Sequence, residues 1–249
     1  MPIVRILLIL LALASPALAQ DGARDAVAAR EAAQAFRVYV EGVAKEGGRP
    51  DLTRPEVAAQ LGRVFNIDAF NALPPAQASD LDWLLDWMDA ANSVNKLFTR
   101  YGSKPGPQPD LEALTRNMSA YEDQFAVAMN FMIRGYARQA VASKLFKASL
   151  TTAQFTPVRE RGFEGARSSA ARFILATVCA AVEGSSRPAN VRLVAAAIRD
   201  TREVWADYFL PQDRAIVIEQ LADFARKVSD ETARADLTAF TAALRAVNI

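Results

Sequence analysis

Apolar residues recur along this chain at alternating intervals of three and four positions, the spacing that places them on one side of an α-helix. The longest series covers residues 111–136, and a second covers 191–208. Shorter series of the same kind cover 29–43, 217–228 and 237–247. The alternation of period two that is typical of a half-buried strand is essentially missing. The pattern therefore predicts an all-α protein, a helical bundle of about seven helices.

Residues that begin or interrupt helices lie between these series. Thr156 followed by Pro157 is typical of a helix start, and Ser229 is a candidate cap for the last helix. The segment SKPGPQP at 103–109 has three prolines in five residues and forbids a helix, so it is a possible subdomain break. Because this connector is short, we expect residues 20–249 to form a single helical domain.

The predicted helix that ends near residue 184 carries a stripe of small side chains. The stripe consists of Gly162, Gly165, Ser169, Ala176 and Ala180. A glycine inside a helix costs about 0.5–1 kcal/mol relative to alanine, a cost that close packing against a second helix would offset. A loop over 157–165 is the alternative, and the sequence leaves both open. Cys179 lies in the apolar run FILATVCAAV, so we expect a buried and unreactive thiol.

The first 19 residues have the features of a secretory signal peptide. One basic residue, Arg5, precedes an apolar run from Ile6 to Leu13, and the small-x-small triplet of residues 17–19 follows. We expect cleavage after Ala19 and export of a soluble protein to the bacterial periplasm or the medium. The run is too short to cross a bilayer and no second long apolar stretch follows, so no transmembrane segment is predicted.

Charge and composition exclude several classes of function. The chain has 29 basic and 28 acidic residues, a balance that argues against nucleic acid as a partner. It contains no histidine, which excludes Ser/His/Asp and Cys/His catalysis as well as histidine-ligated metal. Neither a metal site nor a cofactor is predicted.

Carboxylates are the remaining groups that could catalyse a reaction. A histidine-free hydrolase acting on cell-wall glycan could use a single glutamate as general acid, and Glu183 and Glu164 are weak candidates for it. Glu183 is the odder of the two, since a carboxylate in a last helical turn opposes the helix dipole and would be held neutral if it were buried. A solvent-facing glutamate is the simpler interpretation. The stripe Asp82, Asp86, Asp89, Ser93, Lys96 and Arg100 is interpreted as a solvated face, with acids first and bases last.

Charge is unevenly distributed along the chain. Eight bases and two acids between residues 134 and 172 give a local net charge of +6, whereas residues 200–236 have a net charge of −4. The candidate anion-binding residues are Arg134, Arg138, Arg159, Arg161, Arg167 and Arg172. They could bind an anionic envelope component or an acidic protein face. Alternatively, the two segments neutralise each other across the bundle.

The longest apolar series is rich in methionine and aromatic side chains. It contains Met118, Tyr121, Phe125, Met129, Met132 and Tyr136, which are candidates for the lining of an apolar-ligand cavity. Methionine adapts to irregular shapes and suits such a lining, but the same stripe also fits an ordinary core. Asn95, Asn117 and Asn130 lie on or near apolar faces and would need hydrogen-bond partners if buried.

Three functional classes remain after these exclusions. The sequence favours a non-enzymatic binding or interaction module of the bacterial envelope, whose partner is an envelope protein or an anionic envelope component. A carboxylate-dependent glycan hydrolase and an apolar-ligand carrier are the alternatives. A hydrolase needs carboxylates in a cleft and a carrier needs an enclosed apolar cavity, whereas a binding module needs only an exposed surface.

Overall fold

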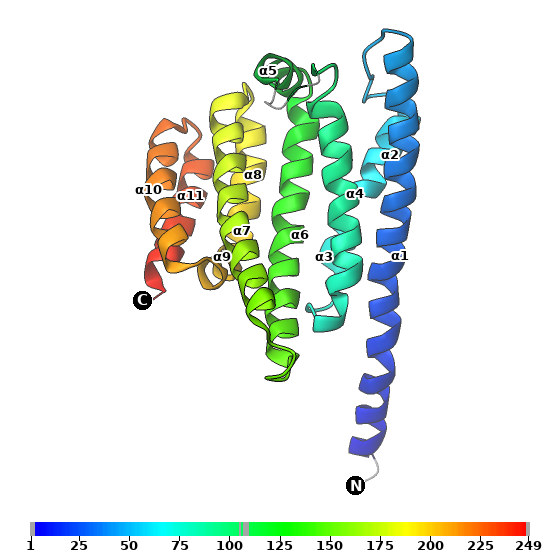
Figure 1. The fold of residues 1–249 in the computed structure, drawn as a ribbon, viewed down its shortest axis with the longest axis vertical. Coiled ribbons are helices and arrows are strands. Elements are labelled where there is room, and N and C mark those ends of the chain that lie inside the picture. The colour runs from blue at the N-terminus through cyan, green and yellow to red at the C-terminus, as the bar shows by residue number, and fades with distance from the viewer. Residues whose placement is uncertain (1–2, 105, 107–109, 248–249) are drawn as a thin grey trace.

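The computed structural model describes residues 3–104, 106 and 110–247, with side chains from residue 21 onward. Within these residues the chain is helical and has no strand, which confirms the predicted class (Figure 1). The helices are α1 (Ile3–Lys45), α2 (Pro55–Val64), α3 (Ile67–Ala72), the 3₁₀-helix η1 (Ala78–Asp80), α4 (Leu81–Thr99), α5 (Leu111–Ala120), α6 (Glu122–Ser149), α7 (Pro157–Gly184), α8 (Pro188–Asp200), α9 (Arg202–Tyr208), α10 (Pro211–Lys227) and α11 (Glu231–Ala246).

The expected count of about seven helices is too low, because this part of the chain contains eleven α-helices. The series over 111–136 is divided at Tyr121 into α5 and α6, and the series over 191–208 is divided at Thr201 into α8 and α9. At the first break the Asn117 amide donates to the backbone oxygens of Thr99 and Tyr101. The spacing of apolar residues by three and four continues across both breaks, so the spacing does not reveal them.

Two further elements, α3 and η1, are too short to produce a periodic pattern. The six-residue helix α3 is capped by Asn66, whose side chain accepts a hydrogen bond from the Ala69 amide at 3.1 Å. Caps elsewhere are partly as expected: Thr156 caps α7, but Asp230 rather than Ser229 caps α11. The expected break at 103–109 lies partly outside the described residues. The side chains of the expected signal peptide lie wholly outside them.

The helices form a row that crosses the molecule, with α4 beside α1 at one edge and α10 beside α11 at the other (Figure 1). Helix α6 lies in the middle, between α4 and α8. The buried side chains form one continuous cluster from Ala26 to Leu244. At its α4 side Trp87 is completely buried, with its ring against Phe70 and Phe131. Tight packing of α4 on α6 requires Gly135, where an added Cβ would lie 2.2 Å from the Met88 sulfur.

Helix α7 differs from the expectation for its small-residue stripe. It begins at Pro157, so the loop alternative is wrong. Close packing against a second helix is also wrong at Gly162 and Gly165, because an added Cβ at either position would meet no atom within 4 Å. Farther along, Ser169 borders one hollow, and Ala176 and Ala180 border another. Among the described residues, Gly162 and Gly165 therefore have open space beside them, whereas Ala171 and Ala181 of the same helix are buried in the core.

The connection between α7 and α8 is held by the carboxylates of Glu122 and Asp123. Asp123 pairs with Arg187 and accepts from the Asn190 side-chain amide. Glu122, at the start of α6, accepts hydrogen bonds from the Ser185 hydroxyl and from the amide and hydroxyl of Ser186, and it pairs with Arg187. Its side chain is 12% exposed. Burial alone would raise the pKa of Glu122, but these hydrogen bonds and the Arg187 charge outweigh it and hold the pKa below its usual value.

We expect Glu122→Gln to destabilise the protein in a pH-dependent way. A depressed carboxyl pKa adds stability above the pKa of the unfolded chain, and this stability is lost as pH falls through the folded-state pKa. Urea unfolding should therefore show a large difference between wild type and variant at pH 7 and a much smaller one near pH 3. A matched Glu219→Gln change on exposed α10 should show little difference at either pH. A deficit that is constant with pH would contradict this account.

Candidate functional site

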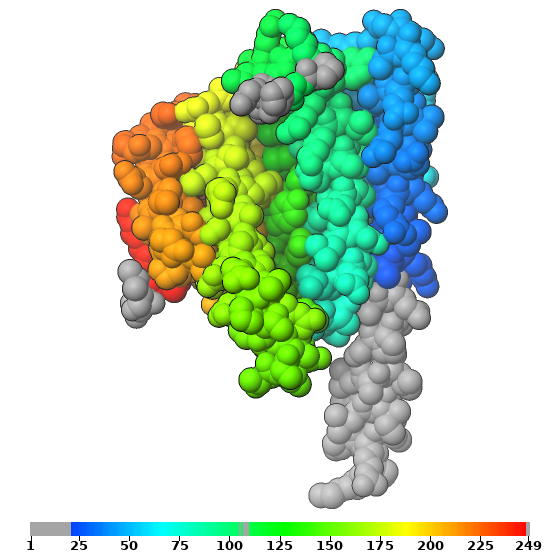
Figure 2. Space-filling model, viewed as in Figure 1, coloured from blue at the N-terminus to red at the C-terminus, as the bar shows by residue number. Residues whose placement is uncertain are grey.

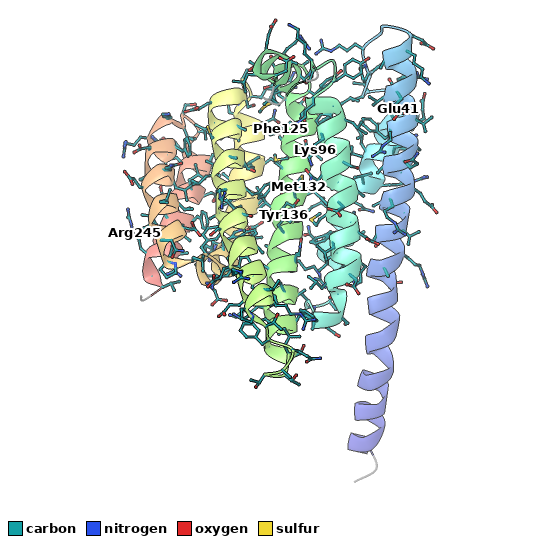
Figure 3. The ribbon with its side chains drawn as sticks, in the orientation of Figure 1. Glu41, Lys96, Phe125, Met132, Tyr136 and Arg245 are labelled. Carbon is teal, nitrogen blue, oxygen red and sulfur yellow. The ribbon has the colours of Figure 1, made fainter. Side chains whose placement is uncertain are left out.

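A groove lies between α4 and α7, with α5 at its upper end and α6 at its base. Its volume is about 600 Å³. Figure 2 shows it as part of a hollow strip between these two helices, and Figure 3 places Lys96 and Phe125 along it. The α4–α7 groove is lined by Asn92, Asn95, Lys96 and Thr99 of α4, Arg100, Ser103, Lys104, Gly106 and Asp110 of the following connection, Leu114 and Met118 of α5, Phe125 of α6, and Ala176 and Ala180 of α7.

Basic side chains give one wall of the groove a positive charge. Within the described part of the chain, Lys96, Arg100 and Lys104 form no salt bridge. Asp110 is the one acidic residue of the lining described above, and its carboxylate accepts from the backbone amides of Ala113 and Lys104. These two bonds lower the pKa of Asp110 and keep it ionised. Three cations against one anion leave the lining positive.

The opposite wall and the base are apolar. Leu114, Met118 and Phe125 are all partly exposed, and Ala176 and Ala180 face them from α7. Among the polar residues, the Asn95 side-chain oxygen is buried and has no hydrogen-bond partner in the described residues. An unpaired buried oxygen costs stability, but this one has almost no surface open to the groove. The groove thus combines apolar contact area with positive charge.

The six apolar-ligand candidates do not line one cavity. Met118 and Phe125 border the groove, whereas Met129 and Met132 are buried in the core. The Tyr121 hydroxyl is also buried in the structure, where it donates to the backbone oxygen of residue 50 at 3.0 Å and accepts from Arg49. Tyr136 borders a separate pocket between α6, α7 and α9.

The six arginine candidates are also dispersed, and four of them already have partners. Arg134 pairs with Asp200 at 2.6 Å, and Arg138 pairs with Asp80 at 3.4 Å. Arg159 donates to the backbone oxygen of Gln154, and Arg167 donates to the backbone oxygens of Tyr208 and Phe209. Arg161 and Arg172 are exposed. Two ion pairs, Arg134–Asp200 and Lys144–Asp207, join the basic segment to the acidic one.

The carboxylate candidates lie outside the groove and have solvated environments. Glu164 and Glu183 are both exposed. Lys227 donates to Glu183 at 2.5 Å and the Cys179 thiol donates to it at 3.4 Å, and both bonds lower the pKa of Glu183. Glu183 is therefore solvent-facing, as the simpler interpretation of the sequence has it, and the alternative of a buried, neutral carboxyl is wrong. Cys179 is partly buried instead of fully buried, and burial together with Glu183 raises its thiol pKa.

The expected solvated face of α4 is present at its acidic end. Asp82, Asp86 and Asp89 are exposed, and Asp86 pairs with Arg30 of α1 at 3.0 Å. In the residues with described side chains, no three His, Cys, Asp or Glu residues are grouped as a metal site would require. None of the helices searched over the described residues is long and apolar enough to cross a membrane.

Sequence reasoning missed the groove because it treated Lys96 and Arg100 only as cations that complement the end of a helix. The signal that could have found them is the cluster Lys96, Arg100 and Lys104 around the predicted connector at 103–109. The partners of Asn117 and Asn130 are within the fold, the first with backbone oxygens and the second with Arg134. Comparisons with known protein families, with curated proteins and with solved structures found no match to this chain.

Proposed function

We propose that this protein is a non-enzymatic binding module of the bacterial envelope, and that its α4–α7 groove binds an acidic segment of a partner protein. One observation carries the proposal: the groove has an apolar base and a positively charged wall. The cations of that wall, Lys96, Arg100 and Lys104, have no acidic partner in the described residues. Charge complementarity of this kind selects an acidic partner and accelerates its association.

The shape of the groove suits a polypeptide segment. An open groove with small residues on one side lets a backbone approach closely, and Ala176 and Ala180 supply such a side. Met118 and Phe125 offer adaptable apolar contact for one or two anchoring side chains.

The alternatives have less support from the same residues. A glycan hydrolase would place a protonated general acid in the cleft, whereas Glu183 and Glu164 lie on the surface outside it. The carboxyl of Asp110, which does line the groove, has a lowered pKa because the Ala113 and Lys104 amides donate to it. An apolar-ligand carrier would enclose its lining residues around one void, whereas the six candidates divide between the core, the groove and a second pocket. For location, residues 1–19 support export to the periplasm or the medium.

Photo-crosslinking in the native cells tests the proposal. A photoreactive phenylalanine at Ala176, which is exposed and borders the groove, should give a discrete adduct with one protein. The same residue at Glu41, exposed on α1 at the far edge of the row, should not (Figure 3). Mass spectrometry of the adduct should identify an acidic crosslinked segment and a mature chain that begins at Gln20.

Charge reversal supplies the second part of this test. Lys96→Glu with Arg100→Glu should reduce the Ala176 adduct at least tenfold, since two attractive charges become repulsive. Arg234→Glu with Arg245→Glu changes the net charge equally on exposed positions of α11 and should leave the adduct unchanged. Equal adducts at Ala176 and Glu41, a lipid adduct, or insensitivity to the Lys96 and Arg100 changes would each overturn the proposal.

A further inference from the structure

A second pocket of about 340 Å³ lies where α6, α7 and α9 meet. Its polar lining consists of Tyr136, Gln139 and Ser143 of α6, Ser169 of α7 and Tyr208 of α9. Phe173 and three alanines supply the apolar remainder. This volume falls within the range of sites that bind small molecules. Tyr136 and Phe173 are in edge contact, with ring centroids 4.9 Å apart.

The chemistry of this lining is polar but uncharged. The lining contains hydroxyl and amide groups and no Asp, Glu, Lys or Arg. Burial raises the pKa of Tyr136, and the Asp89 charge raises it further, so its hydroxyl stays protonated at neutral pH. Burial also raises the pKa of Tyr208, against smaller opposing effects of Ser143 and Arg167. These hydroxyls can both donate and accept hydrogen bonds.

One polar atom of this pocket lacks a partner. The side-chain oxygen of Gln139 is buried and accepts no hydrogen bond from the described residues. Leaving such an oxygen unpaired costs stability, and a leucine of similar shape would avoid the cost. Positions that break a local rule in this way are where functional constraints are expected.

We propose that this pocket binds a small, uncharged ring compound that carries hydroxyl or amide groups, such as a neutral pyranose sugar. A ring with one apolar face fits against Phe173 and Tyr136, and the hydroxyls of the lining can exchange hydrogen bonds with its O–H or N–H groups. The absence of a lining charge disfavours ligands that bear a formal charge, because no counter-ion would offset their desolvation.

This site is independent of the α4–α7 groove. The groove ends at Phe125 of α6 and Ala176 of α7, whereas the pocket begins at Tyr136 and Phe173 of the same two helices. Figure 3 shows Tyr136 well below Phe125 along α6. A result at one site therefore leaves the proposal for the other untouched.

Saturation-transfer NMR on the purified mature protein tests the inference. The neutral probes are methyl glucopyranoside and N-acetylglucosamine, and the charged probes are glucuronic acid and glucosamine. We expect transfer to at least one neutral probe at millimolar concentration and none to the charged pair. No transfer to either neutral probe, or stronger transfer to a charged one, would overturn the proposal.

Two variants locate the binding. Tyr208→Phe should weaken binding about tenfold, because it removes one hydroxyl of the lining. Ala166→Trp, at the exposed rim of the pocket, should block it without disturbing the core. Ala215→Trp on an exposed position of α10 is the matched control and should bind as wild type does. Binding that survives both pocket variants would place the ligand elsewhere and end the proposal.

Discussion

Replacing Trp87 with alanine is expected to lower the free energy of unfolding by about 4 kcal/mol, near the upper end of what one core residue contributes. The side chain is completely buried, and its ring centroid lies 5.5 Å from those of Phe70 and Phe131. The indole nitrogen also donates to the Val64 backbone oxygen at 2.9 Å. Trp87 of α4 thus contacts α2, α3 and α6 at once, and the cavity left by its loss cannot close from one side.

Thermal and urea unfolding would measure this effect. For a protein of this size each kcal/mol corresponds to roughly 2–4 °C, so the midpoint should fall by about 10 °C. Trp87→Phe keeps most of the ring but leaves the Val64 oxygen without its donor, and should cost about 1–2 kcal/mol. Trp83→Ala, at a partly exposed position on the same helix, should cost less than Trp87→Ala. Equal losses at the two tryptophans would show that the aromatic cluster is not the anchor described here.

Asp80→Ala is expected to lower the free energy of unfolding by about 3 kcal/mol, because it leaves a largely buried cation without its counter-ion. The Asp80 and Arg138 side chains are 6% and 13% exposed, and their charged groups lie 3.4 Å apart. Asp80 also accepts from the Gln77 amide at 2.9 Å and so fixes the start of η1. Burial lowers the pKa of Arg138, and the Asp80 charge opposes that shift.

A double variant separates the charge from the packing. Asp80→Leu with Arg138→Met removes both charges and should recover at least half of the stability lost in Asp80→Ala, since well-packed apolar residues can replace a buried ion pair. Part of the loss should persist because the Gln77 amide still lacks its acceptor. Asp68→Ala, an exposed position on α3, is the control for removing a carboxylate. A cost below about 1 kcal/mol for Asp80→Ala, or no recovery in the double variant, would contradict the buried-pair account.

Trp87 and Asp80 both contact α6, the helix whose residues also border the groove and the second pocket. Phe131 and Arg138 lie on the side of α6 that meets α4 and η1, whereas Phe125 and Tyr136 border the two hollows. All four residues belong to α6. One face of this helix therefore contributes to stability, and another face borders the two proposed binding sites. Variants in the hollows are therefore expected to change binding more than stability.

The helical class could be predicted from the sequence because helix formation depends on spacing that is local in the chain. The breaks at Tyr121 and Thr201 could not be predicted, since apolar spacing continues across them. Near the break at Tyr121, the Asn117 amide donates to backbone oxygens that are 16 and 18 residues away in the sequence. Contacts at that separation leave no periodic trace.

The candidate sites show the same division. The apolar series marked Met118, Phe125 and Tyr136 as one face of a single helical stretch, but the structure divides them between α5 and α6. Only packing decided that Met129 and Met132 enter the core while these three border two separate hollows. Local spacing determined that this chain is a set of amphipathic helices, and composition excluded histidine chemistry. The tertiary structure decided which charges are neutralised, as at Arg134, and which have no salt-bridge partner among the described residues, as at Lys96, because a side chain's environment is set by residues distant in the sequence.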